Sequence, residues 1–393
     1  MSRSRIMLGA MLASSLGVTA ACASLLGIDD VGYGPALPTS DAAGSDGGAD
    51  VPVGDAADAC ADGSCCVCPA DASCVGSCVT RIYSSQAELR DIVAGGSYLY
   101  WYPDSRSLYR CLAPNCMNAT LATSIPAPAD SRLVGLAADD RFGFFGTDVS
   151  FGAAPAYRVS RCEHGGDCTK GVFAAGFGEL RSLASDDAGV GWIAAVGPSP
   201  VDGGEFLSVC SPSATCDGGG SGAVIVSDGG DGLGRISSLA LSTPHAFWAE
   251  PDAIKTARVD GVGGVRLVVT ASSPTGLLVR GGHVYYFESS GDGSPVGVLR
   301  RCPADGESCA SPELVADGVT LPAQMTGDGD AIYWVADEQG ALRVYRWLST
   351  RPLGTVERIA IAEGIPTGMA SDRSHIYWSA SLDGGGGIYR LAR

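Results

Sequence analysis

Short apolar segments alternate with polar turns from about residue 80 to the C-terminus. Each unit holds a strand with a large aromatic anchor, a loop, a strand carrying arginine, and a further strand after a hairpin. The anchors follow at intervals of 44, 47, 56, 38, 48 and 44 residues, and they are Trp101, Phe145, Trp192, Trp248, Tyr286, Trp334 and Trp378. Alternation of period two predicts half-buried strands, and a repeat of about 46 residues is typical of one four-stranded blade. The pattern therefore predicts an all-β fold, a seven-bladed β-propeller over residues 79–393.

A second residue type recurs at one position of the repeat and supports this division into seven copies. An arginine recurs on the third strand of every copy except the third, which has Val209; the arginines are Arg110, Arg161, Arg258, Arg301, Arg346 and Arg390. Ahead of each anchor lies a short strand of small and apolar residues, such as Gly135–Asp139 or Gly368–Asp372. Small residues suit the crowded strand nearest the axis of a propeller.

The last copy ends at Arg393 without a fourth strand. Residues 79–93 precede the first copy and align with residues 354–369, which contain a fourth strand. Because an unpaired strand edge promotes aggregation, we expect this N-terminal segment to supply the missing outer strand beside Gly387–Arg393. The ring would then close with strands from both ends of the chain.

An export signal precedes the repeats. Residues 1–21 carry Arg3 and Arg5 before an apolar stretch that is too short for a membrane span, which predicts a signal peptide. The next residues, "VTAAC", resemble a lipobox, and the resemblance implies that the Cys22 thiol receives a lipid. Thr19 stands where that motif usually has an apolar residue, so ordinary cleavage at Ala21–Ala23 is the alternative.

Two further segments follow the signal peptide. Residues 22–59 are rich in Ala, Gly, Asp and Pro and lack the residues needed for a core, which predicts a disordered stalk. Residues 60–78 hold six cysteines. In an exported protein these predict a small Cys-rich knob with three disulfides, and a zinc or thiolate cluster, which needs reduced thiols, is the alternative.

The other cysteines occur as pairs in hairpins between third and fourth strands. Each pair brackets a short turn, which predicts a local disulfide: Cys111–Cys116, Cys162–Cys168, Cys210–Cys216 and Cys302–Cys309. A shared metal site does not fit, because the four pairs lie on four different blades. We expect no metal and no cofactor.

Charge excludes one class of partner. The formal net charge is −17, with no basic stripe that could displace phosphate counterions, so we expect no nucleic-acid partner. Nine Asp and no Glu fall within residues 23–80.

Ser227–Gly232 lacks the ligand spacing of a calcium loop and is predicted to be a turn. No G-x-S-x-G, H-E-x-x-H or phosphate loop is present, so we assign no catalytic residue.

Few side chains remain as candidates for a site. Three histidines share one repeat position on separate blades and are interpreted as strand-entry residues rather than a metal or acid–base site: His245, His283 and His375. His164 lies inside a cysteine hairpin and is predicted to be exposed. The polar candidates near the axial channel are Arg90, Arg132, Arg181 and Gln324.

Propeller connectivity predicts two faces. The cysteine hairpins and the start of the N-terminal strand share one face, and the loops between second and third strands share the other. Three of those loops vary in length, and we expect binding there: Gly146–Ala156, Ala194–Glu205 and Glu288–Gly297.

At "IYWSASLDGGGGIYRLAR" and "HAFWAEPDAIKTARVDGVGG" the repeat resembles the YWTD class of propeller. The match covers residues 79–393, but it lacks the Thr-Asp of that class and has seven copies where six are typical. The full layout resembles myxobacterial-type Cys-rich lipoproteins of the cell envelope. The resemblance implies a propeller that binds other molecules and transfers no functional residue.

We therefore expect an exported, lipid-anchored monomer in the cell envelope, as an outer-membrane lipoprotein, or else a secreted or periplasmic protein. Its propeller would bind a protein or polysaccharide ligand, and only the N-terminal lipid would contact a membrane. The alternatives are a lyase or hydrolase working at the channel mouth, and a purely structural envelope component.

Overall fold

The computed structural model describes residues 79–393 apart from 117, 125–130, 152–153, 167, 169–171, 196–204, 211–215, 217–223, 228–235, 291–294, 321–322, 339–340 and 383. The predicted signal peptide, Cys22, the stalk and the Cys-rich knob lie outside the described residues, as does most of the predicted turn at Ser227–Gly232. In the described part, no helix is long and apolar enough to cross a membrane.

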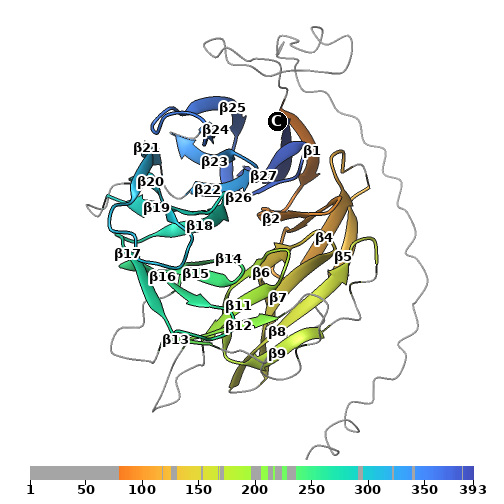
Figure 1. Ribbon diagram of the computed structural model, residues 1–393. Helices are drawn as coiled ribbons and strands as arrows, with labels where there is room; N and C mark the ends of the chain where they lie inside the picture. The colour runs from red at the N-terminus through yellow and green to blue at the C-terminus, as the bar shows by residue number, and fades with distance from the viewer. Residues whose placement is uncertain are drawn as a thin grey trace, which may run out of the picture. The chain divides into compact units, whose positions relative to one another are not determined.

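The strands form seven four-stranded antiparallel sheets arranged around an axis (Figure 1), which confirms the predicted seven-bladed propeller. Blades 1 to 3 are built from β2 (Arg90–Gly95), β3 (Tyr98–Tyr102), β4 (Ser107–Leu112) and β5 (Thr120–Ser124); β6 (Arg132–Ala138), β7 (Phe142–Phe151), β8 (Ala154–Glu163) and β9 (Val172–Phe177); and β10 (Glu179–Ser185), β11 (Val190–Ala195), β12 (Glu205–Cys210) and β13 (Val224–Ser227). In each blade the first strand is innermost, and the chain proceeds outward.

Blades 4 to 6 repeat this order. They are built from β14 (Ser238–Ser242), β15 (His245–Glu250), β16 (Ala253–Arg258) and β17 (Arg266–Thr270); β18 (Thr275–Arg280), β19 (His283–Ser289), β20 (Val296–Pro303) and β21 (Glu313–Thr320); and β22 (Ala323–Asp328), β23 (Ala331–Glu338), β24 (Ala341–Leu348) and β25 (Glu357–Glu363).

Blade 7 combines strands from both ends of the described chain. Its order is β1 (Thr80–Ser85), β28 (Gly385–Ala392), β27 (His375–Leu382) and β26 (Ile365–Ser371). β1 runs antiparallel to β28, with Thr80 opposite Arg390 and Ser85 opposite Gly386. The predicted N-terminal segment was too long, because Arg90–Val93 turns inward and begins β2 of blade 1 instead.

The core lies between the blades rather than within one layer. Buried apolar side chains of the described residues form seven clusters, each shared by two adjacent blades. The second strand of each blade is packed on both faces, so its pattern is a continuous apolar run; Ala331–Ala336 is one example, buried at all six positions. The aromatic anchors supply much of this volume, and Trp101, Trp248 and Trp378 are fully buried.

All six arginines lie on third strands, as predicted, but they share one register position in only five blades. Arg346 pairs with Tyr333 across the sheet, one position before the anchor Trp334, and Arg110, Arg161, Arg301 and Arg390 stand in the same place. Arg258 instead pairs with His245, three positions before the anchor Trp248. The guanidinium of Arg258 donates to the carboxylate of Asp260 in the following hairpin.

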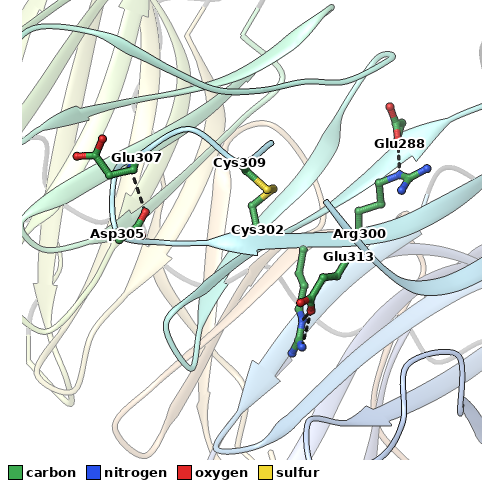
Figure 2. The surroundings of a disulfide bond; sticks show 8 residues. Glu288, Arg300, Cys302, Asp305, Glu307, Cys309 and Glu313 are labelled. Atoms are coloured by element: carbon green, nitrogen blue, oxygen red, sulfur yellow. Dashed lines mark hydrogen bonds and ion pairs between the residues drawn. A yellow bond between two sulfur atoms is a disulfide. The ribbon is translucent and has the colours of Figure 1, made fainter. Parts of the chain in front are cut away.

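The four predicted hairpin disulfides are present, with Cα–Cα distances of 4.9, 4.4, 6.5 and 5.8 Å in chain order. These separations lie within the usual range for disulfides. Figure 2 shows Cys302–Cys309 at the hairpin between β20 and β21.

Hairpins between third and fourth strands also bind the preceding blade. The backbone N–H of Cys216 donates to the Phe173 carbonyl at 3.0 Å, and the backbone N–H of Cys309 donates to the Val268 carbonyl at 2.7 Å. Each acceptor lies at a register shift in the outer strand of the neighbouring blade, where the ladder leaves a residue unpaired. Gly354 repeats this contact with the Val315 carbonyl at 3.0 Å in a hairpin without cysteines.

One of the three predicted variable loops is largely strand. β7 and β8 remain paired out to Phe151 and Ala154, so the segment Gly146–Ala156 is a long hairpin. This hairpin could not be distinguished from a loop in the sequence, because glycines such as Gly146 and Gly152 are typical of turns. Residues 196–204 of the second loop and residues 291–294 of the third lie outside the described residues.

Candidate functional site

A cavity of about 910 Å³ lies on the axis of the propeller and is the candidate site. All seven innermost strands contribute to its wall, mostly through small and apolar side chains such as Ala137, Leu183, Leu241 and Met369. The turns between first and second strands form its rim. In a propeller these turns share a face with the disulfide hairpins, so the cavity opens on that face and not on the face where we expected binding.

Aspartates shape the rim. Asp139, Asp186 and Asp372 each follow an innermost strand, and one carboxylate oxygen of each accepts backbone N–H groups two and three residues ahead. This is the Asx-turn arrangement, which closes a tight hairpin. The second oxygen of Asp186 accepts from the backbone and hydroxyl of Thr243, so this residue also joins blade 3 to blade 4.

Asp372 also accepts a hydrogen bond from a buried tyrosine. Burial alone would raise its pKa, but the Tyr377 hydroxyl donates to it at 2.6 Å, and the backbone of Ser374 and His375 donates as well. The result is a pKa below the usual value. Asp372 is therefore a charged structural group.

Charges on the opposite side of the rim come from blades 5 to 7. Arg280 forms an ion pair with Asp328 at 3.3 Å, and Arg393 pairs with the same carboxylate while donating to the Asp372 carbonyl at 3.0 Å. Burial and the neighbouring Arg280 lower the pKa of Arg393.

Three further charged residues at the rim, Asp140, Asp187 and Arg373, are exposed and are not used in these turns. The mouth thus presents acidic groups on blades 2 and 3, and on blades 5 to 7 it combines arginines with the carboxylates of Asp328 and Asp372.

The prediction that His164 is exposed was wrong. It is half-buried: its Nδ1 lies 2.8 Å from the Tyr100 hydroxyl, and its Nε2 lies 3.0 Å from the Asp139 carbonyl. The carbonyl can only accept, so Nε2 donates to it. The ring also stacks on Tyr98 at 5.5 Å, so the disulfide hairpin of blade 2 locks onto blade 1 beside the rim.

The other three histidines begin the second strands of three different sheets, as predicted. Burial lowers the pKa of His245 and of His375, and nearby arginines add to the shift for both. The His283 Nδ1 lies 3.0 Å from the Gly281 carbonyl. Within the described ranges, no three His, Cys, Asp or Glu side chains come together in a way that could hold a metal ion.

The polar candidates from the sequence do not line the cavity. Arg90, Arg132, Arg181 and Gln324 lie toward the starts of innermost strands, whereas the cavity is lined by the ends of those strands. Arg132 instead holds Asp148 at 3.2 Å. Asp148 also accepts from the Leu180 backbone of the next blade at 2.8 Å, so this pair joins two blades. Burial raises the pKa of Asp148 despite these bonds.

Sequence reasoning missed the rim aspartates. The signal was present, because aspartate recurs where the innermost strand ends: Asp139, Asp186 and Asp372 directly follow that strand, and Asp328 is its last residue. Asp140 and Asp187 then follow two of these positions.

Comparisons with known proteins support the fold. No family model matches the chain, and no curated protein does either. Among solved structures, the chain is similar to the WD40 domain of coronin from Toxoplasma gondii, with a TM-score of 0.52 and 10% identity over 80% of this chain and 86% of that one. It is also similar to the WD40 β-propeller domain of Doa1, with a TM-score of 0.51 and 12% identity over 79% of this chain and 96% of that one.

A third similarity is to a chain of the nidogen/laminin complex, with a TM-score of 0.41 and 16% identity over 72% of this chain and 84% of that one. We draw no argument from this weaker likeness. The comparisons therefore support a β-propeller, and the closer resemblance to the YWTD class stays a prediction.

Proposed function

We propose that the chain is an exported, lipid-anchored propeller that binds a protein through the mouth of its axial cavity. Residues 1–21 would be its signal peptide, Cys22 its lipid attachment site, and residues 22–78 its stalk and Cys-rich knob. The four disulfides support an oxidising compartment outside the cytosol. The Tyr-Trp anchors and the arginine column support a relation to the YWTD class.

The observation that supports the binding function is the difference in side-chain chemistry between the wall of the axial cavity and its rim. The cavity wall consists mainly of small and apolar side chains, and most of the charged lining groups lie at the turns. Binding sites commonly combine an apolar recess with a few polar groups that orient the ligand. The similar WD40 domains are propellers as well, which is compatible with a protein-binding module.

The exposed charges define the test. Asp140 and Asp187 lie on adjacent blades, and their reversal to lysine should leave the turns intact because neither carboxylate closes a turn. The full-length protein would be cross-linked in its native envelope to identify the partner. Affinity for that partner would then be measured for the wild type and for the D140K/D187K double variant.

We expect the double variant to weaken binding at least tenfold. Its control is D252K, an exposed residue in the turn between β15 and β16 on the opposite face. Loss of binding in D252K with none in the double variant would overturn the assignment and favour the loop face. A soluble D140K/D187K protein with unchanged affinity would also refute it. For the anchor, C22A should leave the detergent phase if Cys22 is lipidated.

A further inference from the structure

The outer strand of blade 6 lacks a cover that three other outer strands have. The hairpins before β13, β21 and β25 each donate a backbone N–H to the residue that the register shift of the preceding outer strand leaves unpaired: Phe173, Val268 and Val315. All three residues are buried, at no more than 2% exposure. In β25 the register shift leaves out Ile359, which is only half-buried. Among the residues that the structure describes, no hairpin donates to the Ile359 carbonyl.

Blade 7 has no hairpin that could supply this cover. Its outer strand β1 does not follow its third strand β28 in the chain, because β1 comes from the N-terminal side. The residues that enter β1 therefore take the place that the hairpin between third and fourth strands has in other blades. These residues are Val79 and, before it, the last part of the Cys-rich segment, residues 60–78.

Val79 lies beside the uncovered strand. Its side chain is half-buried and packs on the apolar cluster between blades 6 and 7, on which Ile359 also packs. The next residue, Thr80, begins β1. Because consecutive Cα atoms are 3.8 Å apart, the chain can place no residue from 76 to 79 more than about 15 Å from Thr80. The end of the Cys-rich segment is thus held close to β25.

The other hairpins indicate which residues would donate. In blades 5 and 6 the donors lie four and three residues before the outer-strand residue that pairs with the repeated arginine, as Gly354 precedes Glu357. In blade 7 the residue that pairs with this arginine is Thr80. Counting back four and three residues from Thr80 gives Gly76 and Ser77.

We propose that residues 74–78 of the Cys-rich segment bind the outer strand of blade 6, where the backbone N–H of Gly76 or Ser77 donates to the Ile359 carbonyl. The segment then covers Ile359 as the hairpins of blades 3, 5 and 6 cover its counterparts. A pull on the N-terminal segment is borne first by blade 6 and not by the pairs between β1 and β28, which would otherwise separate one after another from Thr80. The inference does not depend on a lipid at Cys22 or on a partner at the axial mouth.

Ile82 provides a matched comparison for Ile359. The register shift of β1 leaves Ile82 unpaired, and this residue is also half-buried. The hairpin of blade 1 does not cover it in the same way, because the backbone N–H of Cys116 donates to the Leu112 carbonyl of its own hairpin at 3.0 Å. The two isoleucines thus share residue type, register position and partial burial, and only Ile359 lies where the segment would bind.

The test is hydroxyl-radical labelling of the full chain with its disulfides formed, read by peptide mass spectrometry. Ile359 should be oxidised at least about fivefold more slowly than Ile82, because a covered side chain reacts only when its cover opens. The variant G76P/S77P removes both candidate N–H donors and should raise the labelling of Ile359 to that of Ile82, with Ile82 unchanged. The control G44P/S45P changes the same two residue types within the predicted stalk and should label as the wild type does.

Equal labelling of Ile359 and Ile82 in the wild type would overturn the proposal. Continued protection of Ile359 in G76P/S77P, with near-ultraviolet circular dichroism showing a folded protein, would overturn it as well. Slower labelling of Ile82 than of Ile359 would also refute it and would assign the segment to the junction of blades 7 and 1. None of these results affects the D140K/D187K or C22A experiments, so the proposals fail separately.

Discussion

Asp91 lies at the register shift of β2, in the innermost layer of the blade 7–blade 1 junction. Its backbone has φ of 40°, in the left-handed region that Asp and Asn tolerate better than other side chains. β26 packs directly against it: a Cβ added at Gly368 would lie 2.8 Å from the Asp91 Cα and 2.6 Å from the Ile92 nitrogen. The side chain is therefore half-buried, with one oxygen accepting from the Ile92 backbone at 2.8 Å.

Burial raises the Asp91 pKa from 3.8 to about 6, although hydrogen bonds from the Ile92 and Leu136 backbones oppose the shift. A carboxyl group with a raised pKa in the folded state favours folding most when it is protonated. That contribution is complete below about pH 3.8 and is lost as the pH rises through about 6. The shift of about 2 units corresponds to at most about 3 kcal/mol, since one unit equals about 1.4 kcal/mol.

The variant D91N tests this reasoning, because asparagine keeps the shape, the acceptor oxygen and the tolerance of positive φ but never ionises. We expect it to be as stable as the wild type near pH 4 and more stable by up to about 3 kcal/mol at pH 8. Urea unfolding at several pH values gives both free energies, and the other carboxylates, together with Arg90 and Tyr102 nearby, cancel in the difference. The control D252N changes an exposed carboxylate and should show a flat difference. A pH-independent D91N effect, or a variant that loses stability as the pH rises, would refute the argument.

G368A should destabilise the fold by about 1 to 3 kcal/mol, measured by urea unfolding, because the new methyl group meets backbone atoms of β2. G135A, at the matching position of blade 2, should be nearly neutral, because its methyl group meets the Leu183 Cβ at 3.4 Å and the Leu183 nitrogen at 3.9 Å. The double variant C302S/C309S should lose about 2.5 kcal/mol by the chain-entropy model, and an unchanged unfolding midpoint would show that the hairpin is closed without the bond. Deleting residues 79–85 removes the outer strand of blade 7 and should lower the melting temperature and cause aggregation in size-exclusion chromatography; a monomer that melts normally would show that β1 is dispensable for closure.

Local signals made the fold predictable. Each aromatic anchor and each cysteine pair can be recognised from a few adjacent residues. The spacing of the anchors along the chain was enough to count the blades. Arg258 shows the limit of this approach, because its displacement by two residues depends on pairing with His245 across the sheet. A column of identical residues in sequence does not ensure a column in space.

The candidate sites depended on neighbours that are distant in the chain. His164 is buried by Tyr98 and Tyr100, which belong to another blade. Only the registers of the sheets show that Tyr83, Ala316 and Ala360 occupy corresponding positions in the outer strands of three blades. Such comparisons need the strand pairing, which the repeat alone does not define.

The hairpins that donate to the preceding blade have a mechanical consequence. Three of these hairpins, through Cys216, Cys309 and Gly354, each donate a backbone hydrogen bond to the blade that precedes their own. Where such a hairpin carries a disulfide, the bond stabilises the contact between two blades as well as the blade that contains it. A mild reductant would accordingly speed amide exchange first in the neighbouring outer strands β9 and β17, before the reduced blades themselves loosen.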